Sequence, residues 1–99
     1  MATPTTLEPK VGCISTAAQI LGNKWTAQIL RDLADCSQRF CSLEKSVEGI
    51  NPRILSQRLN QLEESGVVSK SDNGYSLTDK GRELIPVLEQ MAQWGAKYC

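Results

Sequence analysis

The sequence lacks histidine entirely, carries no net charge and has no long apolar run. The absence of histidine removes the commonest general base and the commonest metal ligand. Lys and Arg together number 11, as do Asp and Glu, so the total charge does not favour nucleic-acid binding, and the local placement of charge decides that question. No stretch of about 18 apolar residues occurs, so we expect no membrane-spanning helix and no membrane partner.

Residues that could support catalysis or metal binding are few. Cys36 and Cys41 are the one close cysteine pair, and without a second pair or a histidine they do not predict a zinc site. Glu63 and Glu64 are adjacent, so their carboxylates diverge by about 100° on a helix and form no acid–base dyad. We therefore expect no enzymatic activity, no metal and no other cofactor.

The first residues of the chain are polar, with several threonines and prolines, and lack the apolar core of a secretory signal. We expect a flexible N-terminal arm over residues 1–12, a single domain over 13–99, and a cytoplasmic location in which the cysteines are reduced. A domain of this length has a marginal core, so association with a second copy would help to bury apolar surface.

Apolar residues at helical spacing predict four helices in the first two thirds of the chain. We expect the first to be capped by Ser15 or Thr16 and to end at Gly22, and the second to span about 23–34. These two helices precede a pair that is joined by a tight turn.

The third and fourth predicted helices form a helix-turn-helix motif. Ser42 is expected to cap the short third helix, and Gly49 permits the tight turn that follows it. Asn51 is a strong N-cap and Pro52 is favoured at the first helical position, so the fourth helix is predicted over 52–65.

A short hairpin follows the fourth helix. The Asn73-Gly74 dipeptide predicts a two-residue type I′ turn between a strand that begins at 67–68 and a return strand at 75–77. The fold class is therefore mainly α with a small β-hairpin wing: a winged helix-turn-helix with a long C-terminal helix.

The outward face of the fourth helix has the chemistry of DNA recognition. Its polar residues are Arg53, Ser56, Gln57 and Asn60. Arg can bind guanine with two hydrogen bonds, and Asn and Gln can bind adenine in the same way. No acid lies in the first turns, although the alternative of an ordinary solvated polar face stays open.

Further candidate DNA contacts lie around that face, and they are Asn51, Arg39, Lys45, Lys70 and Arg58. Arg39 and Lys45 flank the third helix, where they could contact phosphates or be ordinary surface charges. Lys70 is the one basic residue of the wing. Arg58 lies at the edge of the apolar stripe, where it could either brace the fold against a carboxylate or reach a phosphate.

Thr78 is expected to cap a long last helix that runs to Cys99 with a kink at Pro86. An apolar seam along this helix has heptad-like spacing and consists of Leu84, Leu88, Met91, Gly95 and Tyr98. It is widened by Ile85, Val87 and Trp94. The seam predicts a homodimer, because it is wider than one side of a small domain can cover. The alternative is that the helix only covers its own core.

Several segments together resemble the HxlR-type regulators, which are relatives of the MarR-type winged-helix proteins. The matching segments are Gly22-Asn23-Lys24-Trp25, Arg39-Phe40 with Leu43, 50–59, 62–68, 75–84 and Trp94-Gly95. The resemblance implies a homodimer whose fourth helix enters the major groove of a palindromic operator, with the first and last helices in the dimer interface. The wing is shorter than is usual in that family and lacks its common proline and arginine.

Some members of the family sense oxidants or electrophiles through a cysteine near the N-terminus, and Cys13 occupies that place. The alternative is that Cys13 is a small buried core residue. We expect a sequence-specific transcription regulator, more specifically a repressor, whose oxidant or small-molecule effector the sequence does not identify. A winged-helix module that binds protein instead of DNA is the alternative function.

Overall fold

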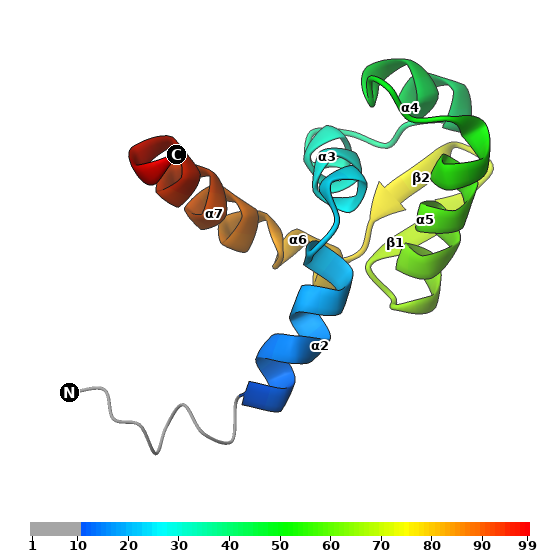
Figure 1. Ribbon diagram of the computed structural model, residues 1–99. Helices are drawn as coiled ribbons and strands as arrows, with labels where there is room; N and C mark the ends of the chain where they lie inside the picture. Colours follow the sequence, from blue (N-terminus) through cyan, green and yellow to red (C-terminus); the bar gives the residue numbers. More distant parts are fainter. Residues whose placement is uncertain (1–10) are drawn as a thin grey trace.

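The computed structural model describes residues 11–99, which form helices and an antiparallel hairpin (Figure 1). The elements are α2 (Val11–Leu21), α3 (Lys24–Leu33), α4 (Phe40–Ser46), α5 (Pro52–Glu64), β1 (Val68–Ser71), β2 (Gly74–Leu77), α6 (Asp79–Arg82) and α7 (Ile85–Tyr98). The predicted fold class, a mainly helical winged helix-turn-helix, is confirmed. Residues 1–10 of the predicted arm lie outside the described residues, whereas 11 and 12 belong to the first turn of α2.

The apolar core lies where α3, α4, α5 and the hairpin converge. Leu30 of α3, Leu43 of α4 and Leu59 of α5 are fully buried there, together with Val67 at the entry to the hairpin. Figure 1 shows α2 and α7 extending away from this compact part of the chain. The predicted apolar stripes therefore build one core that supports the helix-turn-helix motif, and they leave two helices largely outside it.

Helix α2 differs from its predicted limits. It begins at Val11, so Ser15 and Thr16 lie inside the helix and do not cap it. It ends at Leu21, directly before Gly22, as the sequence predicts. Within α2, Leu21 is buried against the core, whereas residues 13–19 are exposed. No helix of the described residues combines the length and the apolar character needed to cross a membrane.

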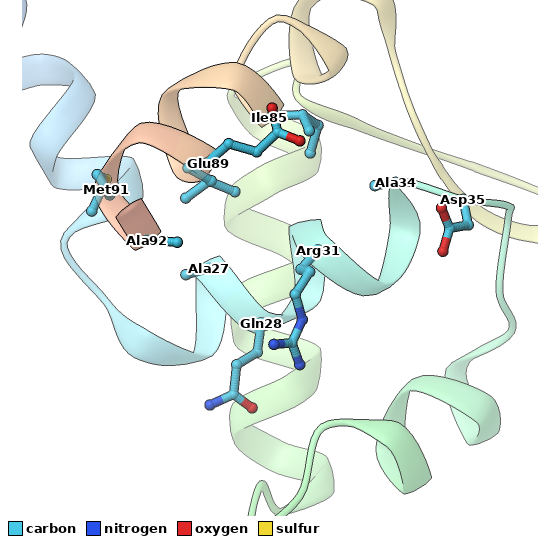
Figure 2. A pocket seen from close by; sticks show the side chains of 10 residues that line it. Ala27, Gln28, Arg31, Ala34, Asp35, Ile85, Glu89, Met91 and Ala92 are labelled. Atoms are coloured by element: carbon cyan, nitrogen blue, oxygen red, sulfur yellow. The ribbon is translucent and has the colours of Figure 1, made fainter. Parts of the chain in front are cut away.

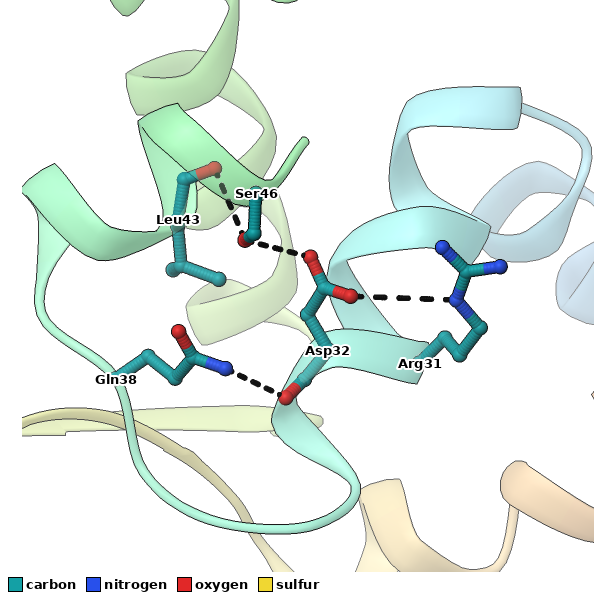
Figure 3. Close-up of polar contacts among 5 residues, drawn as sticks. All are labelled: Arg31, Asp32, Gln38, Leu43 and Ser46. Atoms are coloured by element: carbon teal, nitrogen blue, oxygen red, sulfur yellow. Dashed lines mark hydrogen bonds and ion pairs between the residues drawn. The ribbon is translucent and has the colours of Figure 1, made fainter. Parts of the chain in front are cut away.

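Polar contacts of Asp32 hold α4 against α3 (Figure 3). The Ser46 hydroxyl donates to the Asp32 carboxylate at 2.7 Å, and the Gln38 side-chain amide donates to the Asp32 carbonyl at 2.9 Å. The Arg31 Nε lies 3.9 Å from the same carboxylate. Helix α4 begins at Phe40, so the prediction that Ser42 caps it is wrong: the cap position is Arg39, whose side chain makes no capping bond.

The hairpin forms as predicted, but its turn is displaced by one residue. Ser71 pairs with Gly74, so the two-residue loop is Asp72-Asn73 and Gly74 belongs to β2. Gly74 has a φ of 108°, and no non-glycine residue in the described part of the chain has a positive φ. The type I′ prediction for Asn73-Gly74 is therefore wrong, because that turn requires a positive φ at both positions.

The last helical segment is two helices rather than one kinked helix. Thr78 caps α6 as predicted, since its hydroxyl accepts from the Gly81 N–H at 3.1 Å. Helix α6 ends at Arg82, and Pro86 occupies the first turn of α7. Pro86 has no N–H to donate to the Arg82 carbonyl, and proline fits a first helical turn without loss. The chain therefore breaks ahead of Pro86 and begins a new helix.

Candidate nucleic-acid interface

The start of α5 is held by local capping and by packing beneath the turn. The Asn51 side chain accepts from the Ile54 N–H at 2.9 Å, and Pro52 occupies the first turn, as the sequence predicts. Gly49 adopts a φ of 88° in the preceding turn. A Cβ at Gly49 would lie 3.5 Å from the Trp25 ring, so Trp25 of α3 packs close to this turn. These contacts define the direction in which α5 leaves the turn.

Helix α5 divides cleanly into a buried face and an exposed face. Leu55, Leu59 and Leu62 are buried in the core. The side chains of the four predicted recognition residues are all exposed and make no hydrogen bond or ion pair with other side chains or backbone groups of residues 11–99: Arg53, Ser56, Gln57 and Asn60. The first turn of α5 carries no acid. A helix N-terminus carries partial positive charge, so this face combines free hydrogen-bonding groups with a local field that attracts anions.

The C-terminal end of α5 is tied to the segment after the wing. The Lys80 ammonium donates to the Ser65 carbonyl at 2.6 Å, and the Thr78 hydroxyl donates to the Gly66 carbonyl at 2.6 Å. A cation at a helix C-terminus satisfies exposed carbonyls and complements the helix dipole. Sequence reasoning missed Lys80, because it lies 15 residues beyond Ser65 and no local pattern connects the two.

The wing is joined near its turn, at Tyr75, to the loop before α4. The backbones of Gln38 and Tyr75 exchange two hydrogen bonds, of 2.9 Å and 2.7 Å. A Cβ at Gly74 would lie 2.5 Å from the Gln38 carbonyl oxygen and 3.0 Å from the Arg39 Cα. Arg39 therefore lies directly beside the wing. Gln38 is a second residue that sequence reasoning missed, since the bridge joins segments far apart in the chain.

The predicted flanking cations lie on two elements, α4 and β1. Arg39 and Lys45 are exposed at the two ends of α4. Lys70 is exposed on β1, the strand that packs against α5, with its ammonium 5.7 Å from the centre of the Tyr75 ring. The structure therefore leaves all three predicted cations exposed, on the first helix of the motif and on the wing.

Arg58 is placed differently from the other candidates. It is half-buried, and its Nη1 donates to the Gln61 side-chain oxygen at 2.8 Å. Its Nε is buried without any hydrogen-bond partner. Within residues 11–99 the one recorded ion pair is between Arg31 and Asp32, so the predicted brace from Arg58 to a carboxylate is not formed.

The predicted apolar seam on α7 is uncovered over its C-terminal half. Leu84 and Leu88 are half-buried against the core, whereas Met91, Trp94 and Tyr98 are 50%, 62% and 64% exposed. No residue of α7 is buried, and apart from the neighbouring residues and backbone of α7 itself nothing lies within 4 Å of where a Cβ would stand on Gly95. The alternative that α7 only covers its own core is therefore wrong for this half of the helix.

An open groove lies between α3 and α7 on the side of the seam. It has a volume of about 530 Å³, and Figure 2 shows Ala27 and Gln28 of α3 across from Met91 and Ala92 of α7. The lining is mostly apolar, with Arg31 and Glu89 at its polar edge. The groove continues the uncovered apolar surface of α7 towards the body of the protein.

The cysteines of the described residues are all free and exposed. Cys13 lies in the exposed first half of α2, so the alternative that it is a buried core residue is wrong. A reactive thiol must be accessible to solvent, and Cys13 meets this requirement.

Comparisons with known proteins agree with this geometry. The family model described as HxlR-like helix-turn-helix matches residues 20–99. The chain is 37% identical over 89 residues to the HTH-type transcriptional regulator YvaP of Bacillus subtilis, a match that covers 83% of this chain and 82% of YvaP.

Solved structures of regulators have the same fold. Quinone-bound YodB from B. subtilis superposes with a TM-score of 0.83 at 29% identity, covering 88% of this chain and 99% of that one. The redox regulator HypR in its reduced form superposes with a TM-score of 0.78 at 28% identity, covering 85% of this chain and 90% of that one.

Proposed function

Because the chain belongs to the HxlR-like helix-turn-helix family of transcription regulators and is not an enzyme, we propose that it binds a palindromic operator as a homodimer and represses the genes it controls. In this proposal each protomer inserts α5 into the major groove of one half-site. The two half-sites would lie about one helical turn of DNA apart, as the symmetry of a dimer requires. The protein would act in the cytoplasm, where the operator is accessible.

The exposed face of α5 is the observation that carries the proposal. Arg53 lies in its first turn, and Gln57 and Asn60 follow at helical spacing on the same exposed side. These groups match the edges of guanine and adenine, and Ser56 can bond to either base. The centre of a face that binds protein is typically enriched in aromatic residues and methionine, and the exposed face of α5 carries neither.

Phosphate contacts would surround this face. Asn51 lies at the start of α5, Arg39 and Lys45 at the ends of α4, and Lys70 on the wing. Contacts of this kind set the register of a protein on DNA without reading its sequence. We assign Arg58 to a different role, because its guanidinium is half-buried on the flank of α5.

A second copy of this chain would cover the α7 seam. Met91, Trp94 and Tyr98 together expose an apolar surface that a small domain rarely leaves in water. Gly95 lies between them, where a partner helix could approach closely. The exposed side of α2, including Ile14, would add to the same interface.

Cys13 is the residue that we propose for sensing an oxidant or an electrophile. HypR is described as a redox regulator, and YodB has been solved with a bound quinone. In this chain the Cys13 thiol is exposed on α2, a helix that we place in the dimer interface. Modification of Cys13 would then change the geometry of the dimer and release the DNA.

Binding to DNA from upstream of the protein's own gene, measured across a salt series, tests the proposal. We expect nanomolar binding that exceeds binding to random DNA and weakens steeply with salt, because phosphate contacts release counterions. Arg53→Ala should weaken the free energy of operator binding by about 1–3 kcal/mol and relax the base preference at one position in each half-site. Arg82→Ala removes the same charge from exposed α6 and serves as the matched control.

Two outcomes would contradict the proposal. Equal and weak binding to every fragment in a genome-wide selection would favour the protein-binding alternative. Equal losses for Arg53→Ala and Arg82→Ala would mean that α5 contributes only its charge and reads no sequence.

A further inference from the structure

A polar hollow lies on the flank of α5, away from its outward face. It has a volume of about 390 Å³ and is enclosed by the end of α2, the first turn of α3 and the C-terminal half of α5. Six of its eight lining side chains are polar, and they include Thr26, Arg58, Gln61 and Glu64. The volume lies within the usual range of small-molecule sites, in which convergent polar groups fix the orientation of the ligand. The polar lining of this hollow suits a small polar ligand and not an apolar one.

Arg58 gives this hollow an unsatisfied positive charge. Its guanidinium makes one hydrogen bond, from Nη1 to the neutral Gln61 side chain, and its Nε is buried without an acceptor. No carboxylate in residues 11–99 forms an ion pair with it. A buried donor without a partner is rare in folded proteins, and a guanidinium binds a carboxylate more strongly than it binds an amide.

Thr26 supplies a second polar group on the opposite wall. It is 4% exposed and is the one buried polar residue among the described residues. It lies in the first turn of α3, where the helix carries partial positive charge. The hollow therefore has a guanidinium on one wall, and a hydroxyl at a helix N-terminus on the other.

We propose that this hollow binds the carboxylate of a small polar organic acid. Arg58 holds the carboxylate side-on through Nε–H and Nη2–H, and the Thr26 hydroxyl donates to it from the opposite wall. Gln61 is exposed and accepts only from the Nη1 of Arg58, so a carboxylate that binds the guanidinium leaves this bond in place or displaces a mobile side chain. Glu64 lines the same hollow with a negative charge, which disfavours a dianion such as phosphate and selects a singly charged acid.

The position of the hollow would connect an acid ligand to DNA binding. The ligand would contact α2, which we place in the dimer interface, and α5, which we place in the major groove. This coupling rests on the proposed function, whereas the binding of the carboxylate does not.

Arginine side-chain NMR of the nitrogen-15-labelled protein, with acetate as the probe and no DNA present, tests the proposal. We expect the Arg58 Nε–H signal to shift and saturate at millimolar acetate, while the Arg53 signal from the exposed face of the same helix does not saturate. Glu64→Gln should tighten acetate binding about twofold to fivefold by removing an exposed like charge. Thr26→Val, which keeps the shape of the side chain, should weaken it.

Three results would overturn the proposal. In the first, the Arg58 Nε–H signal shifts in parallel with the Arg53 signal at every acetate concentration. In the second, the Arg58 signal shifts with inorganic phosphate and not with acetate. In the third, it shifts only when operator DNA is added. Binding to DNA is scored in a separate assay. A protein that binds acetate but no DNA would keep this site and lose the proposed function.

Discussion

Gly95→Ala should change the folding of the protomer and the stability of the dimer in opposite directions. Apart from the neighbouring residues and backbone of α7 itself, nothing lies within 4 Å of the position that the added Cβ would occupy, and Gly95 is inside helix α7 with no positive φ. Alanine in a helix interior is more stable than glycine by about 0.5–1 kcal/mol. Within one protomer the substitution should therefore raise the free energy of unfolding by about that amount.

The proposed dimer should respond in the other direction. If a partner helix packs against Gly95, an added methyl group overfills the contact at a cost of about 1–3 kcal/mol. Twofold symmetry brings the methyl group into the interface twice. At about 1.4 kcal/mol for each factor of ten, the dissociation constant of the dimer should rise by at least roughly tenfold.

Sedimentation equilibrium measures the dimer, and urea unfolding of the variant at concentrations where it is monomeric measures the protomer. Ala96→Gly is the matched control, since Ala96 is the exposed neighbour of Gly95 and lies off the seam. It should lower the stability of the protomer and leave the dimer affinity unchanged. A Gly95→Ala variant that is more stable and still dimerises like the wild type would refute close packing at this glycine.

Two further predictions concern the wing and the sensor. Gly74→Ala should lower the free energy of unfolding by about 2–4 kcal/mol, because alanine is strained at a φ of 108° and its Cβ would displace the Gln38 carbonyl. Urea unfolding measures this loss, and faster amide exchange at Tyr75 would locate it at the bridge to Gln38. A substitution without effect on stability would contradict this account. Cys13→Ser should abolish the release of DNA by a thiol oxidant, measured by fluorescence anisotropy. An unchanged response, or an equal effect from the control Cys36→Ser, would exclude Cys13 as the sensor.

The sequence predicted those features whose causes lie within a few residues of one another. The Asn51 cap and Pro52 specify the start of α5 through a hydrogen bond across three residues, and both are found. The leucine spacing of α5 predicted its buried and exposed faces, because a helix repeats its direction every 3.6 residues or so. The outward position of Arg53 and Gln57 follows from the same spacing.

The features that the sequence mispredicted depend on contacts between distant segments. The Asn73-Gly74 dipeptide favours a type I′ turn locally, but the bridge from Gln38 to Tyr75 draws Gly74 into the strand. The unpaired Nε of Arg58 could not be seen in the sequence either. Its placement at the edge of the stripe was correct, but the absence of a carboxylate partner depends on what α2 and α3 bring to that flank.

The break between α6 and α7 has a consequence for how a dimer would present its two recognition helices. Helix α6 is held to the end of α5 by the bond from Lys80 to Ser65. It also packs closely on Val67 at the entry to the hairpin, where a Cβ on Gly81 would clash with the Val67 carbonyl. Helix α7 begins a few residues later and leaves the body of the protein (Figure 1). If the α7 seam binds a second copy, the spacing between the two α5 helices is set at this joint. The break ahead of Pro86 would then contribute to the distance between half-sites, although Pro86 belongs to no element of the helix-turn-helix motif.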